Sequence, residues 1–209
     1  METYLISLAL ADFLPNIAFL VGAFFLVKAS RICSGTRCGR ILMASTLLVF
    51  LGGFLKATWK LLYAAKIADI QWMSQAQFVL LGTGFLGMCV AVIYMVRGSK
   101  TASVTGGGML AMAVWKIPFL FLMTITSLGA EGILAYIAFK RKVLPAAAGF
   151  VVGVMGILAM GSLASAEQTI AMQWVEETIN TIGQLGFMMG CILLYQSFRA
   201  SGCDTGSGD

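Results

Sequence analysis

The residues best suited to chemistry in this sequence are polar side chains set inside long apolar segments. Asp12 and Asn16 lie four residues apart, so they share one face of a predicted helix, with Pro15 between them. Pro15 should bend that helix and leave a backbone carbonyl without its usual donor. A charged residue so deep in an apolar segment is costly in lipid and normally faces a bundle interior or a wet cavity. Asp12 and Asn16 are therefore candidates for a binding site.

The second half of the chain carries a comparable set of polar residues. Lys116 lies close to Pro118, and Glu131 follows in the same apolar region. Prolines next to buried charge are typical of broken helices that expose backbone carbonyls to a ligand. If the two halves of the chain meet in space, Lys116 is the expected ion-pair partner of Asp12. The structural alternative is that these residues only hold a bundle together.

The last apolar segment begins with a polar stripe. Glu177, Asn180 and Gln184 recur at steps of three and four residues, which places them on one helical face. The complete set of candidates for a ligand or ion path is Asp12, Asn16, Lys116, Glu131, Glu177, Asn180 and Gln184.

The sequence offers little for catalysis, and no catalytic residue or cofactor is predicted. Histidine is absent, which removes the commonest general base and the commonest transition-metal ligand. The number of cysteines, five, is odd and their spacing is unpaired, which argues against a disulfide framework. Cys89 and Cys191 are weak metal candidates, because buried cysteine usually acts as a small hydrophobic residue. An enzyme is not the favoured class.

The composition explains what must position these residues. Of 209 residues, 59% are hydrophobic and only 11% are charged, and the mean hydropathy is +0.92. Soluble domains carry about 25% charged residues, so the natural solvent is a lipid bilayer. The net charge of +5 indicates orientation and headgroup contact rather than nucleic-acid binding. We expect a multi-pass protein of the plasma (inner) membrane, and the composition leaves homo-oligomers or partner membrane subunits open.

An internal repeat organises the chain. The segment 71–99 recurs 102 residues later at 173–201, with seven identities in 29 ungapped positions. The shared residues are Gln71/Gln173, Trp72/Trp174, Gly84/Gly186, Phe85/Phe187, Cys89/Cys191, Arg97/Arg199 and Ser99/Ser201. The predicted units are therefore a first three-helix repeat at 1–100, a linker at 101–108, a second three-helix repeat at 109–201 and a disordered tail at 202–209.

The predicted fold is an all-α bundle of six transmembrane helices in a 3+3 repeat. The expected spans are 3–27, 41–63, 74–96, 109–139, 143–164 and 178–198, with the basic segment 28–40 as a cytoplasmic loop. An odd number of spans per unit makes the second unit upside down relative to the first. Lys56 and Lys60, near the end of the second span, are read mainly as side chains that reach the outer headgroups.

A seven-span alternative, arranged 3+1+3, stays open. It divides 109–139 into two short helices near 127–132 and places every basic cluster on the cytoplasmic side, which the positive-inside rule favours. Hydropathy and repeat length favour six spans. In either plan the expected function is a transporter or channel for a small solute or ion, with its polar site at the repeat interface. The alternative is a non-catalytic membrane subunit or scaffold of a larger complex.

Overall fold

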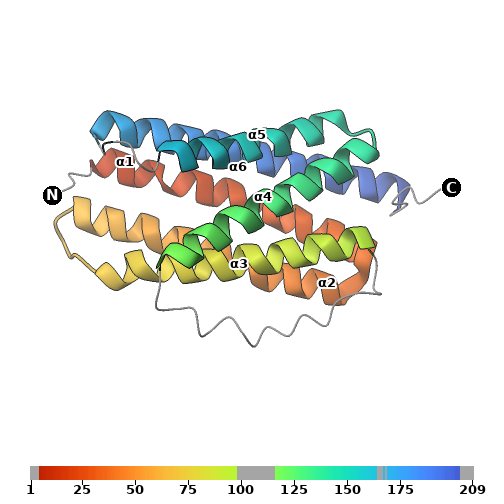
Figure 1. Ribbon diagram of the computed structural model, residues 1–209, viewed down its shortest axis with the longest axis horizontal. Helices are drawn as coiled ribbons and strands as arrows, with labels where there is room; N and C mark the ends of the chain where they lie inside the picture. Colours follow the sequence, from red (N-terminus) through yellow and green to blue (C-terminus); the bar gives the residue numbers. More distant parts are fainter. Residues whose placement is uncertain (1–4, 98–115, 164–166, 168, 203–209) are drawn as a thin grey trace.

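The computed structural model describes residues 5–97, 116–163, 167 and 169–202, and all the regular structure in these ranges is α-helical. The helices are α1 (Ile6–Ala11), α2 (Phe13–Ala64), α3 (Gln71–Arg97), α4 (Lys116–Lys140), α5 (Leu144–Leu163) and α6 (Ile170–Ser201) (Figure 1). Five helical stretches in this part of the chain are long and apolar enough to cross a membrane. The prediction of a helical, multi-pass membrane protein is confirmed at this level, whereas the identity of the membrane stays a prediction.

The longest helix, α2, reverses direction at Gly35. This glycine has φ 78° and ψ −178°, a backbone conformation open almost only to glycine. The residues on either side, 13–34 and 36–64, form two arms that run back along one another. Phe13 of the first arm meets Phe54 of the second at a centroid distance of 5.6 Å, and Asn16 lies against Gly53. Helix α2 is therefore a hairpin of two helical passes joined at Gly35.

The predicted loop at 28–40 is wrong, because this segment is helical except at Gly35. Its arginines are good helix formers, so helical structure continues from both spans until glycine alone provides the reversal. Close approach of the two arms is eased at Gly39, whose missing side chain leaves room for the stem of Arg31.

The helical passes form a closed ring in which each contacts the next along the chain, and α6 returns to the first arm of α2 (Figure 1). Phe19 of the first arm marks the centre of this ring. It stacks on Phe187 of α6 at 5.4 Å and meets Phe85 of α3 edge-on at 6.3 Å. Phe85 and Phe187, which the proposed repeat pairs, therefore contribute to one apolar core.

The direction of α4 differs from expectation. Gly82 of α3 contacts Phe119 of α4, and further along both helices Cys89 contacts Gly129. The contacting positions rise together, so α3 and α4 run parallel (Figure 1). The first arm and α6 are parallel by the same criterion, since Phe19 meets Phe187 and Phe25 meets Tyr195.

The expected inversion of the second three-helix unit is therefore wrong. In both units the first and third passes run one way and the middle pass runs the other way. The prediction failed because it assumed that the connection between the units stays on one side of the membrane. Helix α3 ends at the end of the bundle where α4 ends, and not where α4 begins (Figure 1). The predicted linker 101–108 and the first part of 109–139 lie outside the described residues.

Helix α4 is continuous from Lys116 to Lys140. The seven-span plan required a turn near 127–132, and this turn is absent because Gly129 and Gly132 both take helical conformations within α4. The real turn comes after Lys140, where Lys142 adopts a positive φ of 60°. The Val143 N–H there donates to the Ala138 carbonyl at 2.9 Å and closes the end of the helix.

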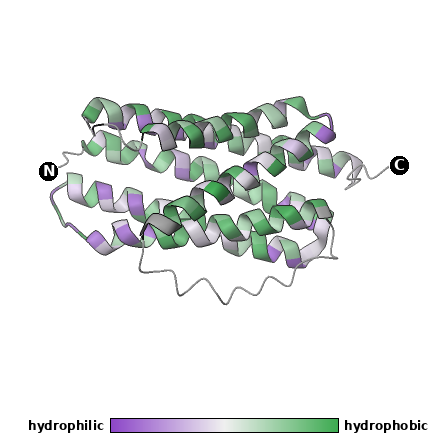
Figure 2. Ribbon diagram, in the orientation of Figure 1, coloured by the Kyte–Doolittle hydropathy of each residue, from purple (hydrophilic) through white to green (hydrophobic). Residues whose placement is uncertain are grey.

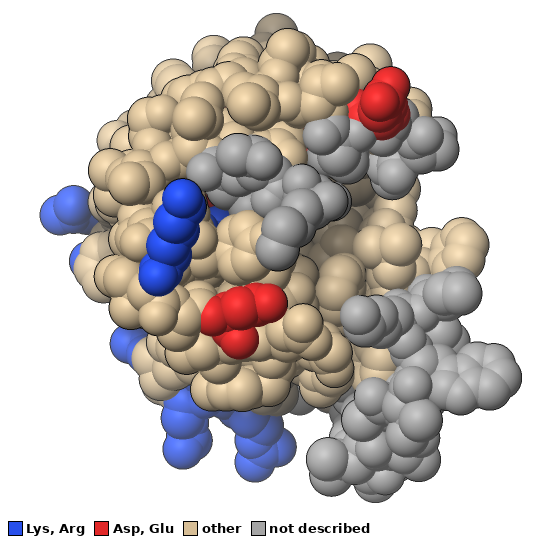
Figure 3. Space-filling model, turned by 90° about the vertical axis from the view of Figure 1, so that its left-hand side faces the viewer, with Lys and Arg blue, Asp and Glu red and all other residues tan. Residues whose placement is uncertain are grey.

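The middle of the bundle is largely hydrophobic, and the more hydrophilic residues lie mainly toward its ends (Figure 2). The reversal at Gly35 and the turn at 140–142 lie at one end, which carries Arg31, Arg37, Lys140 and Arg141. The opposite end, formed by the α2–α3 and α5–α6 connections, displays acidic as well as basic side chains on a largely uncharged surface (Figure 3). The two strongly basic turns, at 35 and at 140–142, therefore share one end, whereas the α2–α3 connection at the other end carries Lys66 together with Asp69.

Candidate functional site

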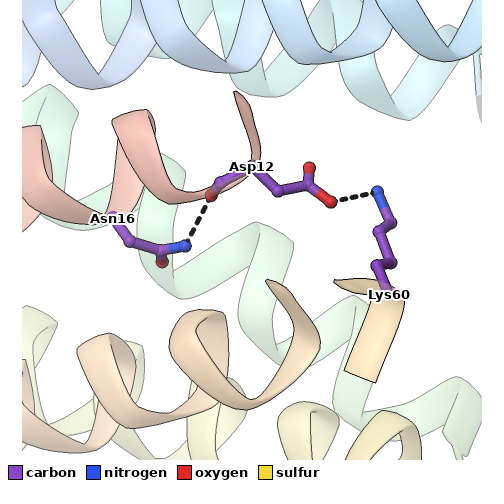
Figure 4. A network of polar contacts seen from close by, with 3 residues as sticks. All are labelled: Asp12, Asn16 and Lys60. Carbon is purple, nitrogen blue, oxygen red and sulfur yellow. Dashed lines mark hydrogen bonds and ion pairs between the residues drawn. The ribbon is translucent and has the colours of Figure 1, made fainter. Parts of the chain in front are cut away.

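A buried ion pair joins the start of the first arm of α2 to the second arm, within the first half of the chain. Asp12 occupies the break between α1 and α2, and its carboxylate is 2.6 Å from the Lys60 ammonium of the second arm (Figure 4). The two side chains are only 7% and 15% exposed. Asn16 supports this break, because its side-chain amide donates to the Asp12 backbone carbonyl at 2.7 Å. Its amide oxygen rests against Gly53, where a Cβ atom would occupy the same space.

Glu177 of α6 brings the second half of the chain to this pair. Its side chain is 7% exposed, and its carboxyl group lies close to that of Asp12. Lys56, one helical turn before Lys60, acts electrostatically on both acids. We call Asp12, Lys56, Lys60 and Glu177 the interface cluster.

The interface cluster has nearly balanced charge and an unused acceptor. Two carboxyl groups face two ammonium groups, so removal of one member leaves a buried charge without compensation, which costs about 3–5 kcal/mol. The Oε1 atom of Glu177 is buried and has no hydrogen-bond partner. Buried polar atoms are normally paired, and such an exception points to a proton, ion or polar ligand. The cluster is therefore equipped to exchange a small charged species.

The outer rim of the cluster is aromatic. The Trp59 ring stacks on Tyr63 at 5.9 Å, and its indole N–H donates to Asp69 at 3.1 Å. Tryptophan and tyrosine favour the interface between lipid and water, which places the cluster just inside one membrane surface.

Glu131 occupies a separate position within the second half. Its side chain is 4% exposed, and its Oε2 atom is buried without a hydrogen-bond partner. The carboxyl group rests against Gly153 of α5, in the space that a Cβ atom would fill. Ser127, one turn earlier, donates to the Thr124 carbonyl of its own helix and does not serve Glu131.

The remaining predicted site residues are not members of the interface cluster. Asn180 and Gln184 are half-buried on α6, and Gln184 has a buried Oε1 atom without a partner. The side chain of Lys116 lies outside the described part of the structure. The structure pairs Asp12 with Lys60, and the expected pair of Asp12 with Lys116 stays a prediction.

The prediction from the sequence placed Lys60 mainly at the headgroups and missed its pair with Asp12. The feature that reveals this pair is the reversal of the chain at Gly35. In a hairpin centred there, positions near 58–60 come level with position 12. Gln173 was also missed; it is 6% exposed and has an unpartnered Oε1 atom on the same α6 face as Glu177.

The weak metal candidates do not form a metal site. Among the described residues, no group of three or more histidine, cysteine or acidic side chains is placed to hold a metal ion. Cys89 packs against Gly129 of α4, and Cys191 is fully buried in α6; both are free thiols. These contacts are the packing role of a small hydrophobic residue.

Cys33 corrects the expectation drawn from the odd cysteine number. It is disulfide-bonded, whereas Cys38, Cys89 and Cys191 are free thiols. An odd number of cysteines excludes complete pairing but still permits one bond between positions far apart in the sequence.

No protein-family model, curated protein or solved structure matches this chain. The functional proposal therefore rests on the fold and on the interface cluster.

Proposed function

We propose that this chain is an integral membrane transporter or channel for a small solute or ion, and that the interface cluster is its binding site. The observation that carries the proposal is the buried, unpartnered Oε1 atom of Glu177 beside the Asp12–Lys60 ion pair. Buried ionisable groups in membrane helices typically belong to ion pathways or proton relays. Here they come from both three-helix units, so relative movement of the units would open or close the cluster.

We also propose that the two units derive from one repeated three-helix element. Gly84 and Gly186 support this, because each lies against a backbone carbonyl of the preceding helical pass. A Cβ atom at Gly84 would lie 2.8 Å from the Ser45 oxygen, and one at Gly186 would lie 2.6 Å from the Gly149 oxygen. The repeat positions therefore perform the same close-packing task in both halves.

In this proposal the two ends of the described chain face opposite sides of the membrane, because the first described helix begins at the end of the bundle opposite to the one at which α6 finishes (Figure 1). The basic turns at 35 and 140–142 then lie on one side. The turn near 127–132 that the 3+1+3 plan required is not part of this arrangement, because α4 is continuous there.

Transport at the cluster would depend on exchange of partners. An incoming proton or cation would bind at the Asp12 and Glu177 carboxyl groups, while Lys60 would move away from Asp12 or stay as a counter-charge. The charge within the cluster then stays close to balanced, which avoids the large cost of an isolated buried charge.

The test is flux in proteoliposomes with protons, Na⁺ and K⁺ as probes. We expect the wild-type chain to move at least one of them, and Glu177→Gln to lower that flux at least about tenfold. Loss of a hydrogen bond to a charged group is worth about 1.5–3 kcal/mol, and about 1.4 kcal/mol corresponds to a factor of ten.

Glu167→Gln is the matched control, because Glu167 is exposed and its replacement should leave flux unchanged. A wild-type chain that moves none of these probes would contradict the proposal and favour the non-catalytic membrane subunit. Equal flux in the wild type and Glu177→Gln would remove the cluster from the pathway.

A further inference from the structure

We propose that Glu131 is a proton-binding site in the core of the second three-helix unit, separate from the interface cluster. The carboxyl group holds its proton while α5 packs against it at Gly153, and the ionised form requires this contact to open. The proposal concerns the state of one side chain, so it does not depend on flux through the interface cluster.

The first support is the depth of the side chain and the absence of a counter-ion. Glu131 is 4% exposed, and no lysine or arginine of the described chain forms an ion pair with it. An ionised carboxylate without a partner costs several kcal/mol in such a place. A neutral carboxylic acid avoids most of this cost, since it loses far less hydration on burial.

The second support is the shape of the site. The carboxyl group lies against Gly153, where any side chain on α5 would occupy its place. This glycine thus leaves a space the size of the acid group. The Oε2 atom that faces it has no hydrogen-bond partner, which fits a protonated oxygen that gains its partners only when water or another group enters.

The titratable neighbours do not offer an alternative partner. From α6, the group facing Glu131 is the Cys191 thiol, a free and fully buried cysteine. From α3, Cys89 contacts α4 at Gly129, and α5 has no titratable side chain at all. Neither thiol supplies positive charge, so the environment favours the neutral acid. The chemical step is reversible: the carboxylate takes one proton from water and returns it to water when α5 moves away.

The first experiment is infrared spectroscopy of the lipid-reconstituted chain at pH 7. An exposed glutamate has a pKa of about 4.3, so at this pH it absorbs as a carboxylate. We expect Glu131→Gln to lose carbonyl absorbance of a protonated carboxylic acid that the wild type and Glu167→Gln retain. If Glu131→Gln instead loses carboxylate absorbance, Glu131 is ionised and the proposal is wrong.

A second experiment needs no variant to fold. Dicyclohexylcarbodiimide adds across its C=N bond to the O–H of a protonated carboxyl group, and no group leaves, so the peptide gains the mass of the whole reagent. We expect labelling of the peptide that contains Glu131 at pH 7, but not of the exposed Glu167. Labelling of Glu131 only at acidic pH, in parallel with Glu167, would overturn the proposal.

The two proposals can fail separately. Normal flux with an ionised Glu131 would contradict only the proton-binding site, whereas a protonated Glu131 without flux would contradict only the transport function. The Glu177→Gln variant keeps the assignments apart, because it removes a carboxyl group of the interface cluster and leaves the Glu131 signal unchanged.

Discussion

At the scale of single residues, the pair between Asp12 and Lys60 is the feature with the largest energetic consequences. It joins the break between α1 and α2 to the end of the second arm. A buried pair of this kind contributes little net stability, because desolvation offsets most of the attraction. Loss of one partner is nevertheless costly, since the other charge then stays buried without compensation.

We therefore expect Asp12→Asn to lower the free energy of unfolding by about 3 kcal/mol, within the range for a broken buried pair. Replacement of both partners, with Asp12→Asn and Lys60→Met together, should recover much of this loss because no isolated charge remains. Denaturant-induced unfolding in detergent micelles measures both variants. Additive losses in the double variant would show that the two residues act independently.

The sequence identified the acids of the cluster but not their partner. Asp12 and Glu177 were predictable because a charged residue within an apolar helix is costly in lipid and normally belongs to a functional site. Lys60 was not, because lysine near the end of a span usually reaches the headgroups. Only the reversal at Gly35 brings Lys60 level with Asp12, and this depends on the three-dimensional path of the chain.

At the scale of elements, two glycine functions shape the bundle, namely chain reversal at one position and close helix contact at others. Gly35 serves the first function, because its φ of 78° lies in a region that side chains disfavour. Gly84 and Gly186 serve the second, because each lies against the backbone of a neighbouring pass.

Gly35→Ala should lower the free energy of unfolding by about 1–3 kcal/mol, the usual cost of a strained backbone conformation. No atom lies within 4 Å of the position of the new methyl group, so the loss would report backbone strain alone. The control is Gly132→Ala on α4, where the methyl group also meets nothing within 4 Å but the backbone is helical. Thermal unfolding should show an unchanged or higher melting temperature for the control, and equal effects of the two variants would refute the assignment.

Gly84→Ala and Gly186→Ala should each destabilise the bundle by about 1–3 kcal/mol, as expected for overpacking. The new methyl groups would lie 2.8 Å and 2.6 Å from backbone oxygens, so the helices must move apart. Unfolding in detergent, compared with the same Gly132→Ala control, measures the effect. A neutral result at either position would mean that this helix contact is looser than the structure indicates.

The existence of the helices was largely predictable, but the residues at which they begin and end were not. Apolar runs of sufficient length specify helices in a bilayer, because every backbone group must be paired within the segment. Charge then suggested that helices end at 27 and resume at 41, whereas helical structure continues almost to Gly35. Likewise α6 begins at Ile170, well before the predicted start at 178, because Thr169 caps it by accepting from the Met172 N–H at 3.2 Å.

At the scale of the whole molecule, the orientation of the two units matters most. The parallel packing of α3 on α4 brings the strongly basic turns at 35 and 140–142 to one end. The positive-inside rule assigns this end to the cytoplasm. The disulfide at Cys33 lies at the same end, although disulfides persist mainly in oxidising compartments. The basic residues of several separate segments agree with one another, and they assign this end to the cytoplasm.

The relation between the units was not predictable from the sequence. The repeat indicated that there are two similar units, but similarity does not reveal whether the chain between them changes sides. Charge favoured the same orientation for both units, and the parallel contacts of Gly82 with Phe119 and of Cys89 with Gly129 agree with charge. Hydropathy instead favoured six spans, and therefore an inverted second unit, because it counts only clearly apolar segments.

The central claim, that both units face the same way, can be tested by membrane sidedness. Single cysteines are introduced into a variant whose native cysteines are replaced by alanine, at exposed positions of the two ends. Thr36→Cys and Lys140→Cys report one end, and Ile67→Cys and Glu167→Cys report the other. A membrane-impermeant maleimide is then applied to intact cells and to inverted vesicles.

We expect positions 36 and 140 to react from the same side, which the basic residues assign to the cytoplasm, and positions 67 and 167 to react from the opposite side. Labelling of 36 and 140 from opposite sides would refute the common orientation, because it would require an inverted second unit. The parallel packing of α3 on α4 would then be wrong, and the interface cluster could no longer join the two halves at one end.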